Sequence, residues 1–406
     1  MKKTLNHIIF FGFCAVAVLL HIYQKFLPIT LVLVSLLILV YPNIKQRFKA
    51  NKVKKYLVCS SVFYLLHAVG LLYSENFNYG TFDLEVKASF ILLPIVLSLT
   101  PKGVIDKIPL IIKIFLFTGF FVVIYTFIFV AYEYATRDLY FTYYLYSARM
   151  SQFIHVGYLA IYLNLSIVLI LASFTHRYSI AIKSILLRIL MLILFTTMIV
   201  ISGSKNGFIV TFIIYVSFAL IYFIKIKKKS FILYSLIGLI LFLSSISIFS
   251  PLTFKKFTDM FENTKTEITD KSTTGSTQIR KIAWEAAITK IKEKPLIGHG
   301  SGDVKDQLMS YYKENGYTGA YEKKMNAHNQ FLQTTIGIGI VGLTSLLSLF
   351  GLLIYYARKN NDIVLGFFTL IFVLASLTES VFEVQAGVVF FNFMVMILLM
   401  RKRSAV

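Results

Sequence analysis

The chain has 406 residues and a formal net charge of +22, yet only 15% of its residues are charged and 57% are hydrophobic. Soluble globular domains are about one quarter charged, so this composition excludes an ordinary soluble domain and a disordered chain. The only cysteines, Cys14 and Cys59, lie in apolar runs and predict no disulfide framework. A mean hydropathy of +0.74 indicates many membrane spans.

Apolar segments long enough for helical spans recur along the whole chain. At roughly 20 residues per span, the sequence predicts an all-α polytopic membrane protein with about twelve transmembrane helices. These helices are expected near 8–22, 26–42, 56–73, 88–100, 108–131, 153–174, 184–202, 207–224, 231–250, 328–356, 363–378 and 386–400. We therefore predict three parts: spans one to nine in 1–250, a polar loop in 251–327, and spans ten to twelve in 328–406.

Basic residues concentrate in every second connection between these spans. The rich connections carry Lys2 and Lys3, Lys45 to Lys55, Lys102 to Lys113, Arg177 to Arg188, Lys225 to Lys229, Arg358 and Lys359, and Arg401 to Arg403. The opposite short connections hold only Lys25, Lys87, Arg137, Arg149 and Lys205. The positive-inside rule then places both termini in the cytoplasm and the 251–327 loop outside. The net charge follows from this topology, and we expect no nucleic-acid partner.

The 251–327 loop is far longer than a connector needs to be, so we expect it to be partly folded and functional. Within it, the spacing of apolar residues predicts a helix from Thr277 to Lys294, which Pro295 ends. We interpret this helix as amphipathic and expect it to rest on the membrane surface.

A glycine-rich turn, Pro295 to Gly302, follows this helix and allows close backbone approach to an anion or to another helix. It does not follow a strand, so it is no dinucleotide fingerprint. The loop ends in Ala327-His328-Asn329-Gln330-Phe331-Leu332, which runs into the tenth span. An imidazole at this interface can exchange protons near neutral pH or donate to a phosphate.

Three motifs occur in a specific order in this region. Arg280 precedes Trp284 by four residues, Pro-x-x-Gly-x-Gly begins at Pro295, and Ala-His-Asn-x-Phe-Leu begins at Ala327. In these motifs the chain resembles the O-antigen ligase family and its polymerase relatives. The predicted topology agrees, since that family has twelve spans with a large periplasmic loop between the ninth and tenth, in a GT-C-like architecture.

The resemblance implies a metal-independent membrane glycosyltransferase without a cofactor. Such an enzyme transfers a glycan from a polyprenyl diphosphate carrier to a sugar hydroxyl of the lipid A core, at the periplasmic face of the bacterial inner membrane. Arg280 and His328 match the family's catalytic residues. Arginine neutralises a departing diphosphate, and the histidine acts either as the base or as a diphosphate contact. A lysine, Lys205, stands where the family usually has an arginine.

We expect further substrate contacts around these catalytic residues. The candidates are Lys205, Arg149, His155, Tyr158, Asn329 and Trp284. Some of these residues also have a structural explanation. Lys205 is equally suited to snorkelling at a helix end, and His155 and Tyr158 to an interfacial aromatic belt. Arg280 could be a solvated charge on its helix and His328 an ordinary interfacial histidine, but their motifs favour a function for both.

Several alternatives remain open at the level of the sequence. The same donor chemistry serves a polysaccharide polymerase, although a single large loop favours a ligase. A transporter or flippase is less favoured because internal repeats and charges at mid-membrane are not evident, and a scaffold would not need the motifs. Glu379 and Glu383 suggest either function or pairing with a structural arginine. Asp83 and Glu85 have the spacing of a metal-binding pair, but solvation is the better interpretation.

Overall fold

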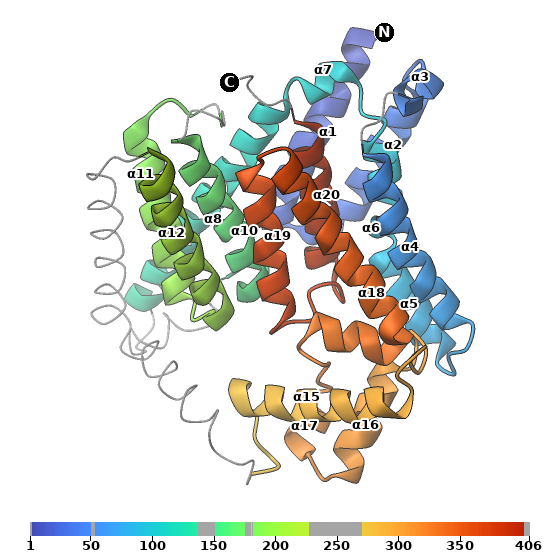
Figure 1. Cartoon of the computed structure of the whole chain (residues 1–406). Coiled ribbons are helices and arrows are strands. Elements are labelled where there is room, and N and C mark those ends of the chain that lie inside the picture. The colour runs from blue at the N-terminus through green and yellow to red at the C-terminus, as the bar shows by residue number, and fades with distance from the viewer. Residues whose placement is uncertain are drawn as a thin grey trace. The chain divides into compact units, whose positions relative to one another are not determined.

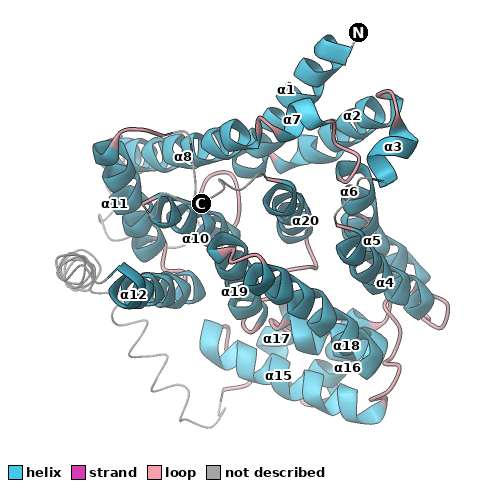
Figure 2. Ribbon diagram, turned by 45° about the horizontal axis from the view of Figure 1, so that its top comes forward, coloured by secondary structure: helices cyan, strands magenta, loops and turns pink. Residues whose placement is uncertain are grey.

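The computed structural model describes residues 2–49, 53–136, 151–174, 180, 182–226 and 270–401. This part of the chain contains helices and connecting loops and no strand (Figure 2). Five of its helices are long and apolar enough to cross a membrane: Lys2–Ile22, Ile108–Thr136, Val156–Ser173, Lys205–Tyr222 and Gln330–Lys359. Shorter apolar helices accompany them, including Ile363–Ser376 and Gln385–Met400. The predicted all-α polytopic membrane fold is therefore present in the described residues.

The chain divides into two compact units. The first comprises Met1–Arg47, Thr100–Thr258 and Met400–Val406, and the second comprises Phe48–Leu99 and Asp259–Leu399.

The first unit holds most of the predicted N-terminal spans. Its helices are α1 (Lys2–Ile22), η1 (Gln24–Phe26), α2 (Leu27–Val40), α7 (Lys102–Ile105), α8 (Ile108–Thr136), α10 (Val156–Ser173), α11 (Ile185–Ile201) and α12 (Lys205–Ile226), and α3 (Ile44–Lys49) crosses its boundary. Helix α1 packs against α2 and α8, while α10 packs against α11 and α12. The predicted ninth span, 231–250, lies outside the described residues.

The second unit is built around one long helix. Its elements are α4 (Lys54–Leu71), α5 (Phe77–Lys87), α6 (Ser89–Leu97), α15 (Ser276–Glu293), α16 (Val304–Glu314), α17 (Thr318–Glu322), α18 (Gln330–Lys359), α19 (Ile363–Ser376) and α20 (Gln385–Met400). Helix α18 packs against α4 on one side and α19 on the other (Figure 1). The predicted span 88–100 corresponds to α6, which has 9 residues. That length rises only about 14 Å, so α6 alone does not cross a bilayer core.

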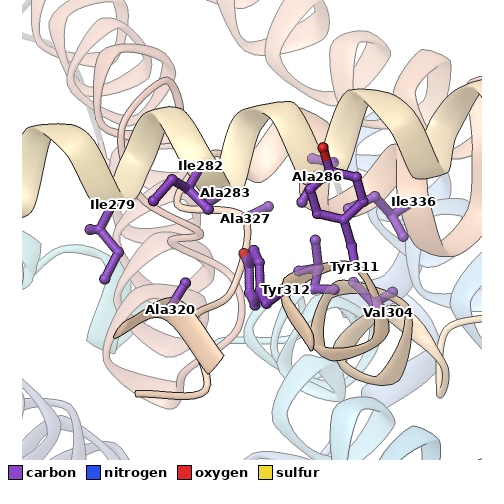
Figure 3. Close-up of a cluster of buried hydrophobic side chains, with 12 residues drawn as sticks. Ile279, Ile282, Ala283, Ala286, Val304, Tyr311, Tyr312, Ala320, Ala327 and Ile336 are labelled. Atoms are coloured by element: carbon purple, nitrogen blue, oxygen red, sulfur yellow. The ribbon is translucent and has the colours of Figure 1, made fainter. Parts of the chain in front are cut away.

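The predicted loop helix exists as α15, and its apolar face is buried. Ile279, Ile282, Ala283, Ala286 and Ala287 recur three or four residues apart and therefore share one face. In Figure 3 this face lies over α16 and α17, with Tyr312 and Ala320 beneath it. The expectation that this face rests on the membrane surface is wrong, because protein already covers it.

The glycine-rich turn after α15 packs into a break in α18. Gly339 has φ +62° and interrupts the helical hydrogen bonds. The turn supplies replacements: His299 N–H donates to Ile336 O at 2.8 Å and Gly300 N–H to Gly337 O at 2.9 Å. A Cβ atom on Gly298 would lie 2.5 Å from Gly337 C, which explains the glycine there. Of the two roles considered for this turn, the structure therefore shows close approach to a helix.

Candidate functional site

Helix α15 directs Arg280 and Trp284 to the same side of the second unit. The two residues are one helical turn apart and flank the buried apolar face, so the packing of that face against α16 and α17 sets their direction. Arg280 Nε–H donates to Thr378 O at 3.1 Å, in the loop between α19 and α20. Trp284 Nε1–H points to His328 O at 3.5 Å.

His328 lies at a sharp turn directly before α18. Its φ of +44° falls in the left-handed region, which is unfavourable for a residue with a Cβ atom. The side chains of its neighbours hold the turn: Asn326 Oδ1 accepts from His328 N at 3.0 Å, and Asn329 Oδ1 caps α18 by accepting from Phe331 N and Leu332 N. The backbone therefore presents the imidazole at a defined position ahead of the helix.

Glu379 joins Arg280 and His328. One carboxylate oxygen, Oε1, forms an ion pair with Arg280 Nη2, and the other, Oε2, lies 3.0 Å from His328 Nδ1. We call these three residues the Glu379 cluster. Its members come from α15, from the turn before α18 and from the α19–α20 loop (residues 377–384), so only the tertiary structure brings them together. Asn329 Nδ2–H also donates to Leu377 O of that loop at 3.1 Å.

The electrostatics of the cluster favour an ionised carboxylate. Burial acts to raise the pKa of Glu379, but the hydrogen bond with His328 and the charge of Arg280 outweigh it and hold the pKa below its ordinary value. A carboxylate can only accept hydrogen bonds, so His328 donates through Nδ1–H. This bond selects the tautomer in which Nε2 carries the lone pair.

The side chains of the cluster are partly exposed. The side chains of Arg280, Glu379 and His328 are 24%, 29% and 20% exposed. His328 Nε2 makes no hydrogen bond to any residue that the structure describes. The arrangement thus offers a proton acceptor beside a guanidinium group, with a carboxylate that orients both.

A second charged group involves the same α19–α20 loop. Lys87 Nζ pairs with Asp83 and, at 3.0 Å, with Glu383 Oε1; we call these three residues the Lys87 triad. Burial raises the pKa of Glu383, although Lys87 opposes this. Asp83 is buried while Glu85 is exposed, so the two acids do not face a common metal site. The expectation that Asp83 is solvated is wrong, because it pairs with Lys87. Within the described part of the chain, no group of three or more His, Cys, Asp or Glu side chains is arranged to hold a metal ion.

The other predicted contacts belong to the first unit. Lys205 is the first residue of α12, after a turn in which Gly203 has φ +68°. Asn164 of α10 contacts the first turn of α12, since its Nδ2–H donates to Gly207 O at 3.2 Å. His155 caps α10 by accepting from Gly157 N, and its ring packs edge-on against Tyr158. Arg149 lies outside the described residues.

Glu379 is not among the site residues predicted from the sequence. The available signal was an acidic residue in a short connection between two apolar segments, a position where a charge is costly to maintain. Its pairing with an arginine was one of the two open interpretations, and the structure shows that pairing. The partner is Arg280, a residue already implicated by its motif.

The fold and the cluster together define a polytopic membrane protein with an arginine, histidine and carboxylate site between its helices. Residues 190–347 match the family model described as O-antigen ligase, the family that the motifs indicated. The domain is shared by ligases and polymerases and implies glycosyltransferase-type activity. The match includes Lys205, Arg280 and His328, whereas Glu379 lies beyond it. No curated protein matches the chain.

Proposed function

We propose that the Glu379 cluster catalyses transfer of a glycan from a polyprenyl diphosphate carrier to a sugar hydroxyl of the lipid A core. The observation that carries this proposal is the convergence of Arg280 and His328 on one carboxylate. Both residues were implicated by motifs far apart in the sequence. If Arg280 were only a solvated charge and His328 only an interfacial histidine, the two residues would not need to share Glu379 as a partner.

The reaction needs one base and one site for negative charge. The acceptor hydroxyl oxygen attacks the anomeric carbon of the glycan, the bond from that carbon to the diphosphate oxygen breaks, and the electron pair leaves with the diphosphate. His328 Nε2 takes the hydroxyl proton, and Arg280 offsets the charge that grows on the departing phosphate. The balance requires no oxidant, reductant or nucleotide.

Glu379 has two roles in this scheme. Its bond to Nδ1–H keeps Nε2 available as the acceptor and stabilises the imidazolium that forms when the proton arrives. Its pairing with Arg280 holds the guanidinium in place before the substrate binds. Lys205 remains a proposed phosphate contact on the strength of its sequence motif.

Ligation and polymerisation differ only in the acceptor. We favour ligation because the polar segment between the ninth and tenth predicted spans is a single large loop. Purified enzyme supplied with donor and lipid A core should form the capped core. If the core stays unmodified while donor alone yields longer lipid-linked chains, the enzyme is a polymerase.

Substitutions within α15 test the proposal directly. Arg280→Ala should lower turnover by about two to three powers of ten, the usual loss for one charge-stabilising group. Arg280→Lys should recover only part of this, because the charge returns without the planar fork. Lys292, an exposed cation on the same helix, is the matched control, and Lys292→Ala should keep full activity. Full activity of Arg280→Ala in correctly inserted protein would exclude this site.

We also propose that transfer needs no divalent metal ion. The diphosphate is already an activated leaving group, and a guanidinium binds phosphate oxygens without a metal. Transfer by the purified enzyme should therefore proceed in the presence of EDTA and without a nucleoside triphosphate. A rate that is abolished by EDTA and restored by Mg²⁺ would contradict this part of the proposal.

A further inference from the structure

Lys87 is a charged residue in a fully enclosed position. It is the last residue of α5, is 1% exposed, and pairs with Asp83 one turn earlier on the same helix. Its other partner, Glu383 Oε1, lies 3.0 Å away in the α19–α20 loop. Lys87 therefore connects α5 with the loop that carries Glu379.

A buried charged triad contributes little net stability to a fold, because its charges lose their hydration. Burying charges costs several kcal/mol per ion in general, and well-packed apolar residues often serve stability as well or better. The triad also contains two carboxylates for one ammonium group. A buried group of this kind is easier to explain if the geometry that it imposes is useful elsewhere.

Glu383 also contacts the first turn of α18. Its Oε1 also accepts from Gln330 Nε2 at 3.2 Å, and Gln330 Oε1 accepts from Phe382 N at 2.7 Å. Gln330 is fully buried and lies two residues after His328. Together with the bond from Asn329 to Leu377, these contacts bind both ends of the α19–α20 loop to the first turn of α18.

We propose that Lys87 is a positioning residue for glycan transfer: through Glu383 and Gln330 it fixes the α19–α20 loop so that Glu379 faces Arg280 and His328. The catalytic consequence rests on the proposed function of the Glu379 cluster. The structural consequence, an ordered α19–α20 loop, does not.

The two carboxylates of the triad provide a matched comparison. Asp83→Asn leaves a balanced pair of Lys87 with Glu383, and this pair still connects α5 to the loop. Lys87→Met removes the connection. Both variants disturb the same buried group. If the triad holds the α19–α20 loop in place, the loop should be less ordered in Lys87→Met than in Asp83→Asn.

The experiment combines hydrogen exchange with kinetics on the full-length protein in detergent. Lys87→Met should speed amide exchange in 377–384 and lower kcat by about a hundredfold, the effect of a small misplacement of catalytic groups, while the KM for the donor changes little. Lys87→Arg should restore part of both. Asp83→Asn should leave exchange in the loop as in the wild type. If Lys87→Met does not fold, Gln330→Leu breaks the same connection without a change of charge.

Other outcomes separate the two proposals. Lys87→Met could speed amide exchange in the loop while both Lys87→Met and Glu379→Gln keep the wild-type rate of transfer. That result would support the positioning of the loop by Lys87 and would overturn the proposed function. Unchanged loop exchange in both Lys87→Met and Gln330→Leu would overturn the positioning role. Equal acceleration of exchange throughout α4, α5 and α18 in Lys87→Met and Asp83→Asn would also overturn it, because the triad would then serve general stability.

Discussion

Nδ1 of His328 lies 3.0 Å from Oε2 of Glu379, which follows it by 51 positions in the chain. Because this bond leaves Nε2 as the proton acceptor, we expect His328 to act as the base in glycan transfer. His328→Ala should lower kcat about as severely as Arg280→Ala, and the pH profile of kcat in His328→Gln should differ from that of the wild type.

The pH profile distinguishes a base from a hydrogen-bonding residue. If His328→Gln retains substantial activity with an unchanged profile, His328 positions the substrate and another group accepts the proton. Glu379→Gln is informative in the same assay. It cannot carry the negative charge that stabilises an imidazolium, so we expect lower kcat at every pH.

The lowered pKa of Glu379 predicts how acid affects stability. An acid whose pKa is lower in the folded state stabilises the fold above its unfolded pKa, near 4.5, and this stabilisation is lost as the pH falls through the folded value. The thermal midpoint of the wild type in detergent should therefore decline more steeply below about pH 5 than that of Glu379→Gln. Parallel curves for the two proteins would mean that the pair contributes no such stabilisation.

The break in α18 predicts a sharp contrast between two glycines of one helix. A Cβ atom on Gly339 would lie 2.1 Å from Leu296 O, at a φ of +62°. Gly339→Ala should therefore cost more than about 2 kcal/mol. Gly351, also in α18, has nothing within 4 Å of such an atom, and Gly351→Ala should be neutral or slightly stabilising. Thermal unfolding of both variants tests this, and equal midpoints would show that the turn does not enter the helix.

The distribution of basic residues predicts the topology. Reporter fusions at Lys54, and at Lys228, which lies outside the described residues, should report the cytoplasm. A fusion near Ser272 should report the periplasm. A cytoplasmic signal at Ser272 would place the Glu379 cluster on the wrong side for a polyprenyl-linked glycan and would overturn the proposed function.

Local patterns in the sequence correctly predicted α15 and its apolar face. Residues such as Ile279 and Ala283 repeat at helical spacing, and Pro295 ends the run, so neighbouring positions alone determine this element. What covers the face was not predictable in the same way. Tyr312 and Ala320 pack there, and a spacing pattern does not distinguish a protein partner from a lipid surface.

The sequence by itself determined the class of protein and predicted two residues of the Glu379 cluster. Hydropathy depends on composition within a window, and motifs such as those around Arg280 and His328 are contiguous, so both are readable without a fold. Only the tertiary structure decided that Glu379 joins them and that Lys87 pairs with Glu383. Such pairs form between segments far apart in the chain, and their partners are selected by how α5, α15, α18 and the α19–α20 loop pack in three dimensions.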